Sequence, residues 1–425
     1  MTNVETAPTP LTPDPHIFRN RNFCWMWVAR LFWTIAVLIQ SVTLGWQVYA
    51  VSRLTQSVEQ SALMVGMLGL VQFLPMFALV LFAGETADRY DRRKIVLCCA
   101  GLSMLCALGF ATLALHPSPS LWPVFGIVLL FGIARAFMGP AVAALGPMLV
   151  PRDQLPKAIA WNALSMQGGM IIGPWVGGAL CAVSPATSYG VAWMLFVLSI
   201  ACVLMIRAQT KPELQEGSRL LLIRQGLRYV WKNRLVFGAI SLDLFAVLLG
   251  GATALLPVFA RDVLHVDADG FGLLRAGPAI GAALMAIYLG WRPVQRQAGP
   301  LMLGAVAVFG IATLVFAFSE LLVLSVLALA ILGAADAISV FIRQSLVQIT
   351  TPDFLRGRVS AVSSLFVSAS NELGEFESGV AARFLGPIGA AVFGGVGSIL
   401  VTGLWARWFP ELRNADRLID PQLKD

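Results

Sequence analysis

Charge and histidine are scarce in this sequence. Of its 425 residues only 12% are Asp, Glu, Lys or Arg, and only three are histidine. Soluble domains carry roughly 25% charged residues, so this composition excludes a soluble globular protein. The few charges that remain must be placed where a bilayer tolerates them, and their positions become informative.

Recognisable catalytic and metal-binding patterns are also missing. The six cysteines lie within or at the ends of apolar stretches, with no CxxC pair and no neighbouring histidine, so we interpret them as packing residues. The sequence has no nucleophile triad and no phosphate-binding loop. We therefore expect no enzyme, no cofactor and no metal site, and a polytopic enzyme or receptor is the weakest interpretation of the chain.

Long apolar stretches are what the sequence has instead. Its mean hydropathy is +0.78, and about 20 apolar residues allow a helix to cross the roughly 30 Å of hydrocarbon in a bilayer. The sequence therefore predicts an all-α membrane protein with twelve transmembrane helices. They are expected at 24–51, 62–83, 95–115, 121–147, 160–183, 187–206, 235–259, 270–291, 300–317, 321–343, 358–383 and 386–408.

The longest polar connection divides these helices six plus six. We expect one six-helix bundle at 19–206, a cytoplasmic linker at 207–234 and a second six-helix bundle at 235–409. The linker includes a basic amphipathic stretch, Leu221–Arg234, suited to the anionic inner leaflet. The polar, Pro- and Thr-rich residues 1–18 lack an apolar signal core and are predicted to be a disordered cytoplasmic tail, and 410–425 a second cytoplasmic tail.

The net charge of +7 is explained by topology. With both termini inside, nearly all basic residues outside the spans fall on the cytoplasmic side, and only Arg53, Arg261 and Arg383 are expected outside. This is the distribution that the positive-inside rule requires. The charge therefore gives no support to nucleic-acid binding.

A short motif joins the second and third predicted helices. Gly84, Asp88, Arg89 and Arg92 lie in the run GETADRYDRR, which resembles the loop signature G-x-x-x-D-R-x-G-R-R of the major facilitator superfamily. That resemblance implies a latch in which Asp88 meets the start of helix 11 at Gly357 and Arg358. Asp91 replaces the usual glycine, and the corresponding loop at 290–296 lacks the acidic residue.

A second motif lies in the fifth predicted helix. It is the glycine-rich run GMIIGPWVGG, similar to the pattern G-x-x-x-G-P-x-x-G-G of the exporter branches of the same superfamily. Glycines four residues apart form a flat face for close helix contact, and a proline bends the helix. The alternative is a packing face without bearing on transport direction. Its motif residues are Gly169, Gly173, Pro174, Gly177 and Gly178.

A few polar residues are expected to lie deep in the first bundle. Arg135 begins RAFMGPA, similar to the family's R-x-x-x-G motif, which implies a role in proton coupling or substrate contact; a structural arginine is the alternative. Arg30, Gln40 and Gln47 on the first helix are candidates to line a cavity. Arg30 can instead snorkel to the inner interface.

The intramembrane acids all fall in the second bundle. In the predicted helix 358–383, Asn371 and Glu375 belong to one polar stripe, and Glu372 lies beside it. We expect this stripe to face a cavity and to take part in proton coupling. A structural hydrogen-bond network is the alternative. Asp243 and Asp336 are further candidates, and each could instead pair with an intramembrane arginine. Glu377 points away from Glu375 and should have a different partner.

These features predict a secondary active transporter of the major facilitator fold. The chain most resembles the enterobactin-exporter group, which implies a proton-coupled exporter of a drug-like or siderophore molecule, working by alternating access. We expect a monomer in the bacterial cytoplasmic (inner) membrane, whose partners are a small-molecule substrate, protons and lipid, with no nucleic acid. An uptake symporter or a phospholipid flippase on the same fold is the alternative.

Overall fold

The regular structure of the described residues is entirely helical. The computed structural model describes residues 17–116, 120–151, 154–208, 210–211, 219–292, 294 and 296–416. Most of the predicted N-terminal tail and residues 417–425 lie outside them. Residues Ile17–Arg19 form a 3-10 turn, η1, and the side chain of Ile17 is buried against the first bundle. The first bundle therefore begins slightly before the boundary predicted at residue 19.

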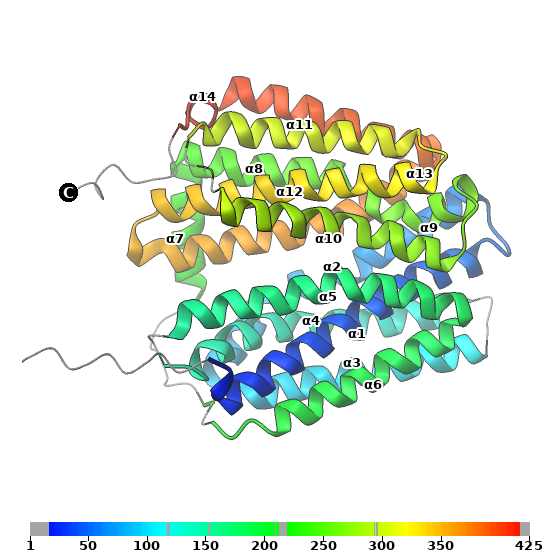
Figure 1. Ribbon diagram of the computed structural model, residues 1–425, viewed down its shortest axis with the longest axis horizontal. Coiled ribbons are helices and arrows are strands. Elements are labelled where there is room, and N and C mark those ends of the chain that lie inside the picture. The colour runs from blue at the N-terminus through cyan, green and yellow to red at the C-terminus, as the bar shows by residue number, and fades with distance from the viewer. Residues whose placement is uncertain are drawn as a thin grey trace, which may run out of the picture.

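Six long helices form the first half of the molecule (Figure 1). They agree with the predicted spans, although α2 and α5 begin or end several residues beyond them. Polar side chains cap several of these helices; Asn20 accepts from Asn22 and Phe23, for example, at the start of α1. The helices are α1 (Arg21–Ser52), α2 (Val58–Arg89), α3 (Arg92–Leu115), α4 (Trp122–Met148), α5 (Leu155–Val183) and α6 (Pro185–Leu204).

The second half repeats this plan. Its first span begins as α8 (Arg234–Leu249) and continues through the short segments η3 (Ala252–Leu255), α9 (Leu256–Val258) and η4 (Phe259–Val263). The next spans are α10 (Ala268–Trp291), α11 (Ala298–Ala317) and α12 (Leu322–Thr350). The chain ends with α13 (Asp353–Trp408) and the short α14 (Pro410–Arg413).

The segment α13 contains two membrane spans. Gly386 within it has a left-handed φ of 74° and is followed by Pro387, so the helix breaks there. A straight helix of 54 residues would be about 80 Å long, far more than a bilayer needs. Eleven helices among the described residues are long and apolar enough to span a membrane, and this break makes twelve spans, as predicted.

The linker between the halves contains a helix, α7 (Arg219–Lys232). This helix packs on the second half: the Tyr229 hydroxyl donates to the carbonyl of Thr350 at 2.5 Å, and Val230 is buried with Val347 and Val359. The close approach of Gly226 to the backbone of Arg358 leaves no room for a side chain. The described part of the amphipathic stretch, from Gln225 on, therefore packs on the second half, mainly against α13.

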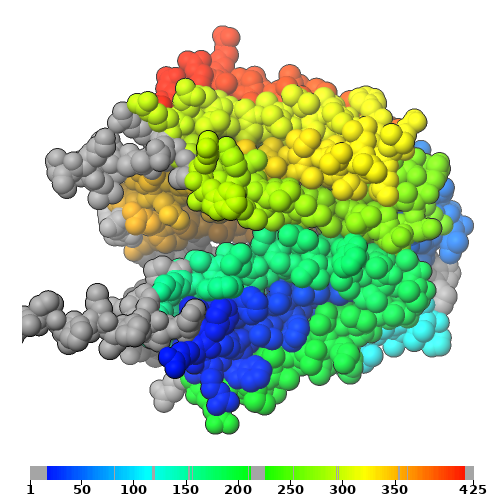
Figure 2. All heavy atoms as spheres, in the orientation of Figure 1, coloured from blue at the N-terminus to red at the C-terminus, as the bar shows by residue number. Residues whose placement is uncertain are grey.

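The two halves meet at one end of the molecule and separate at the other. We call the end at which α1 begins and α13 finishes the termini side, and the opposite end the far side. One apolar core joins both halves on the far side, including Tyr49 and Phe271, whereas the termini side has separate cores around Met138 and Met302. Figure 2 shows an opening between the halves on the termini side.

Candidate functional site

An ion pair between α4 and α13 joins the two halves. Arg135 of α4 lies 3.0 Å from Glu372 of α13, and its guanidinium also donates to the side-chain oxygen of Gln72 at 2.6 Å. Glu372 is only 8% exposed. Gly69 of α2 allows this closeness, because a Cβ atom there would lie 2.5 Å from the carbonyl oxygen of Glu372. The structure thus brings together two sequence-predicted residues from different halves.

A second arginine-carboxylate pair lies one turn along α13. Arg275 of α10 is 3.5 Å from Glu375 and also donates to the carbonyl oxygen of Thr253 at 2.9 Å. Arg275, Glu375 and Gln72 line a small cavity of about 30 Å³ between the halves, together with Ser41 of α1. Asn371, from the same predicted stripe, is exposed.

A third pair lies within the second half, away from the opening. Arg343 of α12 is 3.2 Å from Asp243 of α8, and both side chains are almost fully buried. Asp336 and Ser339 share with Asp243 a cavity of about 10 Å³. The Ser339 hydroxyl and the Arg343 Nε have no hydrogen-bond partner among the described residues. Asp243 therefore takes the intramembrane arginine, and Asp336 lies beside this pair.

The three polar candidates on α1 have different surroundings. Gln40 is fully buried, and neither atom of its amide has a hydrogen-bond partner among the described residues. Gln47 is half-buried in the first half, where the Tyr189 hydroxyl donates to it at 2.7 Å. Arg30 is half-buried and meets the sulfur of Met166 at 3.7 Å. Buried amides normally have partners, so Gln40 is the notable position.

The glycine-rich motif of α5 forms two helix contacts. A Cβ atom at Gly169 or Gly173 would lie 2.6 Å from a side-chain atom of α1, and one at Gly177 would meet the α1 backbone at 2.9 Å. Gly178 instead faces the other half: a Cβ there would lie 2.5 Å from the Cα of Gly272 in α10. Pro174 also borders this contact, through its carbonyl oxygen.

The acidic-basic motif expected in a loop is largely helical. Gly84, Asp88 and Arg89 belong to the last turns of α2, and only Tyr90 and Asp91 lie between α2 and α3. The prediction that the whole motif is a loop was therefore wrong, because helical propensity carries α2 beyond its apolar stretch. Asp91, the departure from the signature, caps α3 by accepting from the backbone N–H of Arg93.

The basic residues of this motif have defined partners. Arg92 donates to the carbonyl oxygens of Ala87 and Ala144, both at 3.1 Å, and so ties α2 and α4 to the start of α3. Arg89 forms an exposed pair with Glu85 at 2.7 Å. On the opposite half, Arg358 donates to the side chain of Gln225 in α7. The latch between Asp88 and the start of α13, which contains the eleventh predicted span, stays a prediction.

A polar cluster on the far side was not predicted. The Tyr49 hydroxyl of α1 donates to Asp262 of η4, and Arg53 lies 3.3 Å from the same carboxylate. Beside it, Trp46 stacks on Phe271 with ring centroids 5.7 Å apart. These contacts cross between the halves. Nothing in the sequence indicated that Tyr49 would meet Asp262 or that Trp46 would stack on Phe271.

Paired charges between movable halves can respond to a proton. A buried ion costs several kcal/mol of desolvation, which a close partner offsets. Protonation of Glu372 would remove its charge and weaken its attraction to Arg135, so the ion pair would cease to hold α4 against α13. The arrangement can therefore couple proton binding to the relative position of the halves without covalent chemistry or a cofactor.

Comparison with known proteins agrees with this architecture. Residues 9–421 match the family described as transmembrane secretion effector. The enterobactin exporter EntS of Citrobacter koseri is 28% identical over 380 residues, covering 89% of this chain and 91% of that protein. EntS of Escherichia coli O9:H4 is 27% identical over 381 residues, covering 89% and 91%.

Solved structures show the same fold at much lower identity. A D-xylose-proton symporter superposes with a TM-score of 0.69 and 14% identity, covering 94% of this chain and 99% of that one. The nucleoside transporter NupG gives 0.72 and 12%, covering 91% and 100%. The predicted fold class and the predicted transporter family are confirmed. The chain belongs to the transmembrane secretion effector family of the major facilitator superfamily and is a multi-pass membrane transporter, not an enzyme.

Proposed function

We propose that this chain exports a siderophore-like organic molecule from the cytoplasm in exchange for protons. The family and its EntS relatives support export and this substrate class. The observation that carries the proton mechanism is the Arg135–Glu372 ion pair, which joins α4 of the first half to α13 of the second. In this proposal the substrate enters through the opening between the halves.

The state described here faces the cytoplasm in this proposal. The halves are held together on the far side by Asp262 with Tyr49 and Arg53, and by the contact of Gly178 with Gly272. The opening lies on the termini side, which the distribution of basic residues places in the cytoplasm. We assign the protein to the bacterial inner membrane as a monomer, with substrate, protons and lipid as its partners and no nucleic acid.

Alternating access then follows from the ion pairs. In the outward-facing state Glu372 takes a proton from outside. The neutral carboxyl no longer attracts Arg135 as an ion, so α4 and α13 can move relative to each other. On return, the proton leaves to the cytoplasm, and the ionised carboxylate pairs again with Arg135. One proton thus enters the cell each time Glu372 is protonated and deprotonated, while the substrate leaves.

The test is efflux from proteoliposomes loaded with a catecholate siderophore. An imposed pH gradient, acidic on the side that receives the substrate, should accelerate efflux by the unaltered protein. Glu372→Gln should bind substrate but lose this acceleration, because the amide cannot carry a proton. Glu377→Gln is the matched control, since Glu377 lies on the same helix in a separate, apolar groove beside Phe376 and Phe384.

Two results would contradict the proposal. Efflux that ignores the pH gradient in the unaltered protein would exclude proton exchange, and a Glu372→Gln variant that keeps the full acceleration would exclude this carboxylate. Deletion of the gene separates export from uptake: loss of an exporter raises the cellular siderophore content and lowers it in the medium, whereas loss of an uptake symporter does the reverse. A flippase would leave both unchanged.

A further inference from the structure

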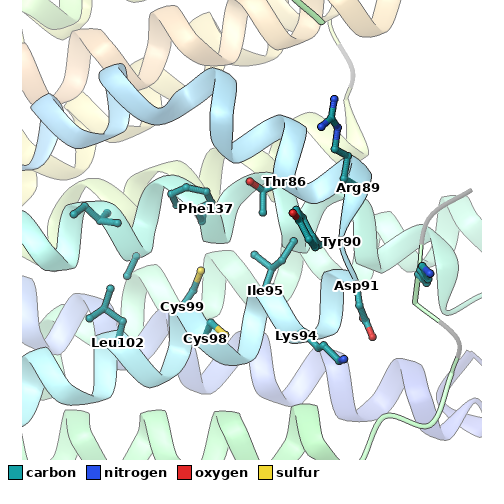
Figure 3. Close-up of a pocket in the computed structure, with 13 residues that line it drawn as sticks. Thr86, Arg89, Tyr90, Asp91, Lys94, Ile95, Cys98, Cys99, Leu102 and Phe137 are labelled. Carbon is teal, nitrogen blue, oxygen red and sulfur yellow. The ribbon is translucent and has the colours of Figure 1, made fainter. Parts of the chain in front are cut away.

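A large groove opens between α2 and α3 near the termini side (Figure 3). Its volume is about 680 Å³, within the range of sites that bind small organic molecules. Apolar side chains form its inner part, with Phe137 of α4 as the floor. The wall on α3 consists of Ile95, Cys98, Cys99 and Leu102.

This groove faces away from the opening between the halves. Ala134 and Phe137 line it from α4, whereas Arg135 of the same helix points to Glu372 in the other half. On a helix, Arg135 and Phe137 are about 160° apart. Large apolar side chains continue beyond the groove, with Phe82 62% and Leu105 59% exposed. Exposed apolar side chains on spanning helices are explained by lipid contact, so the groove opens into the bilayer.

Basic residues surround the end of the groove nearest the termini side. Arg89 ends α2, Lys94 lies in the first turn of α3, and Lys211 comes from the connection after α6. Figure 3 shows Arg89 and Lys94 at the end of the groove opposite Leu102. Lys94 and Lys211 are exposed, and within the described residues neither has a carboxylate at ion-pair distance.

Two acidic side chains near this end, Asp91 and Glu85, have partners. Asp91 accepts from the backbone N–H of Arg93 at 3.0 Å and from the Thr210 hydroxyl at 2.5 Å. Glu85 pairs with Arg89. Asp91 also lines the groove, so Lys94 and Lys211 together leave a net positive charge among these three side chains, and the lysines lie where the apolar part of the groove ends.

We propose that this groove binds one phospholipid with an anionic headgroup. An acyl chain fills the apolar part between α2 and α3, and the phosphate lies between Lys94 and Lys211. A basic residue close to an anionic membrane surface contributes about 1 kcal/mol to binding, and burial of the acyl chain adds apolar contact. The site is independent of the transport pathway, because it lies on the opposite face of α4.

Photo-crosslinking tests the proposal in vesicles of phosphatidylglycerol and phosphatidylcholine in equal amounts. The probes are the same two lipids with a diazirine in one acyl chain, each added at trace level. Phosphatidylglycerol adducts should map to peptides covering 95–102 and 133–137 and exceed phosphatidylcholine adducts there. Lys94→Glu/Lys211→Glu should lower these phosphatidylglycerol adducts roughly tenfold, because two attractive charges become repulsive.

Two further variants keep the test specific. Lys232→Glu/Arg407→Glu makes the same charge change at exposed residues of α7 and α13 and should leave the adducts unchanged. Cys98→Trp fills the groove from an exposed position and should remove adducts of both lipids while the unfolding temperature is kept. Equal labelling by both lipids, or full phosphatidylglycerol labelling of Lys94→Glu/Lys211→Glu, would overturn the proposal. Siderophore efflux is not part of this readout, so its outcome stays separate.

Discussion

Three arginines within the spans each meet a carboxylate. Arg135 pairs with Glu372, Arg275 with Glu375 and Arg343 with Asp243. The first pair joins the two halves, whereas the third is enclosed in one half. Because an ion in a low-dielectric environment requires a partner, each of these residues depends on the other member of its pair. We therefore assign the first pair to the proposed movement of the halves and the third to the stability of one half.

The buried pair in the second half should be structural. Arg343→Leu leaves Asp243 buried without its partner and should lower the free energy of unfolding by about 3 kcal/mol, measured by denaturant titration in detergent. Arg343→Leu/Asp243→Leu should unfold later than the single variant, because it removes both charges. Glu85→Gln breaks an exposed pair and should change stability by less than about 0.5 kcal/mol. A single Arg343→Leu variant as stable as Glu85→Gln would refute this role.

Two close helix contacts between the halves are made where glycine faces glycine. Gly178 of α5 meets Gly272 of α10, and Gly66 of α2 meets Gly379 of α13, in each case across the two halves. These contacts lie on the far side, where the Tyr49–Asp262 cluster also lies. Small residues let backbones touch, so the fit of these helices depends on the missing side chains. The closure of the far side therefore depends on two helix pairs, α5 with α10 and α2 with α13.

A larger residue at Gly178 should open the far side. In Gly178→Val the added Cβ would overlap α10, and overpacking costs about 1–3 kcal/mol, so the outward-facing population should rise roughly tenfold. The measurement is labelling of Ser41→Cys by an impermeant thiol reagent added to the far side, without Cys24 and Cys98. Gly190→Val is the control, because a Cβ at Gly190 meets nothing within 4 Å. Equal labelling of both variants would contradict the assigned closure.

The two ends of the whole molecule differ in shape and in charge. Its opening and the start of α1 lie on the termini side, and the charged connection with α7 lies there too. The far side carries few basic residues, among them Arg53. This asymmetry is what the insertion machinery reads, so it determines how the protein sits in the membrane.

Reporter fusions check this orientation. Alkaline phosphatase, which is active only outside the cytoplasm, should be inactive when fused after Arg413 and active when fused after Ser184 or Ser319, which follow far-side ends of spans. A fluorescent protein that matures in the cytoplasm should give the opposite pattern. Activity of the phosphatase after Arg413 would reverse the proposed orientation and, with it, the direction of the opening.

Much of the fold follows from the lengths of the apolar stretches and from the residues that interrupt them. Helices ending at 383 and beginning at 386 were predicted from apolar length, and the structure breaks the helix at Gly386, where a proline follows the glycine. The end of α2 was misplaced, since Gly84–Arg89 is polar but still helical. The partners of Arg135 and Tyr49 could not be derived, because residues far apart in the chain meet only after the halves assemble.

The spans and the family were predictable from the amino-acid sequence alone, because hydrocarbon thickness and short motifs act on local stretches of chain. Helix packing shows which carboxylate meets which arginine and on which side the halves close. It also shows that Gln47 pairs with Tyr189, whereas Gln40 has no hydrogen-bond partner among the described residues. Those outcomes depend on the distances and orientations between packed helices. A helix's own residues specify its exposed and buried faces but not the side chain that its neighbour will present.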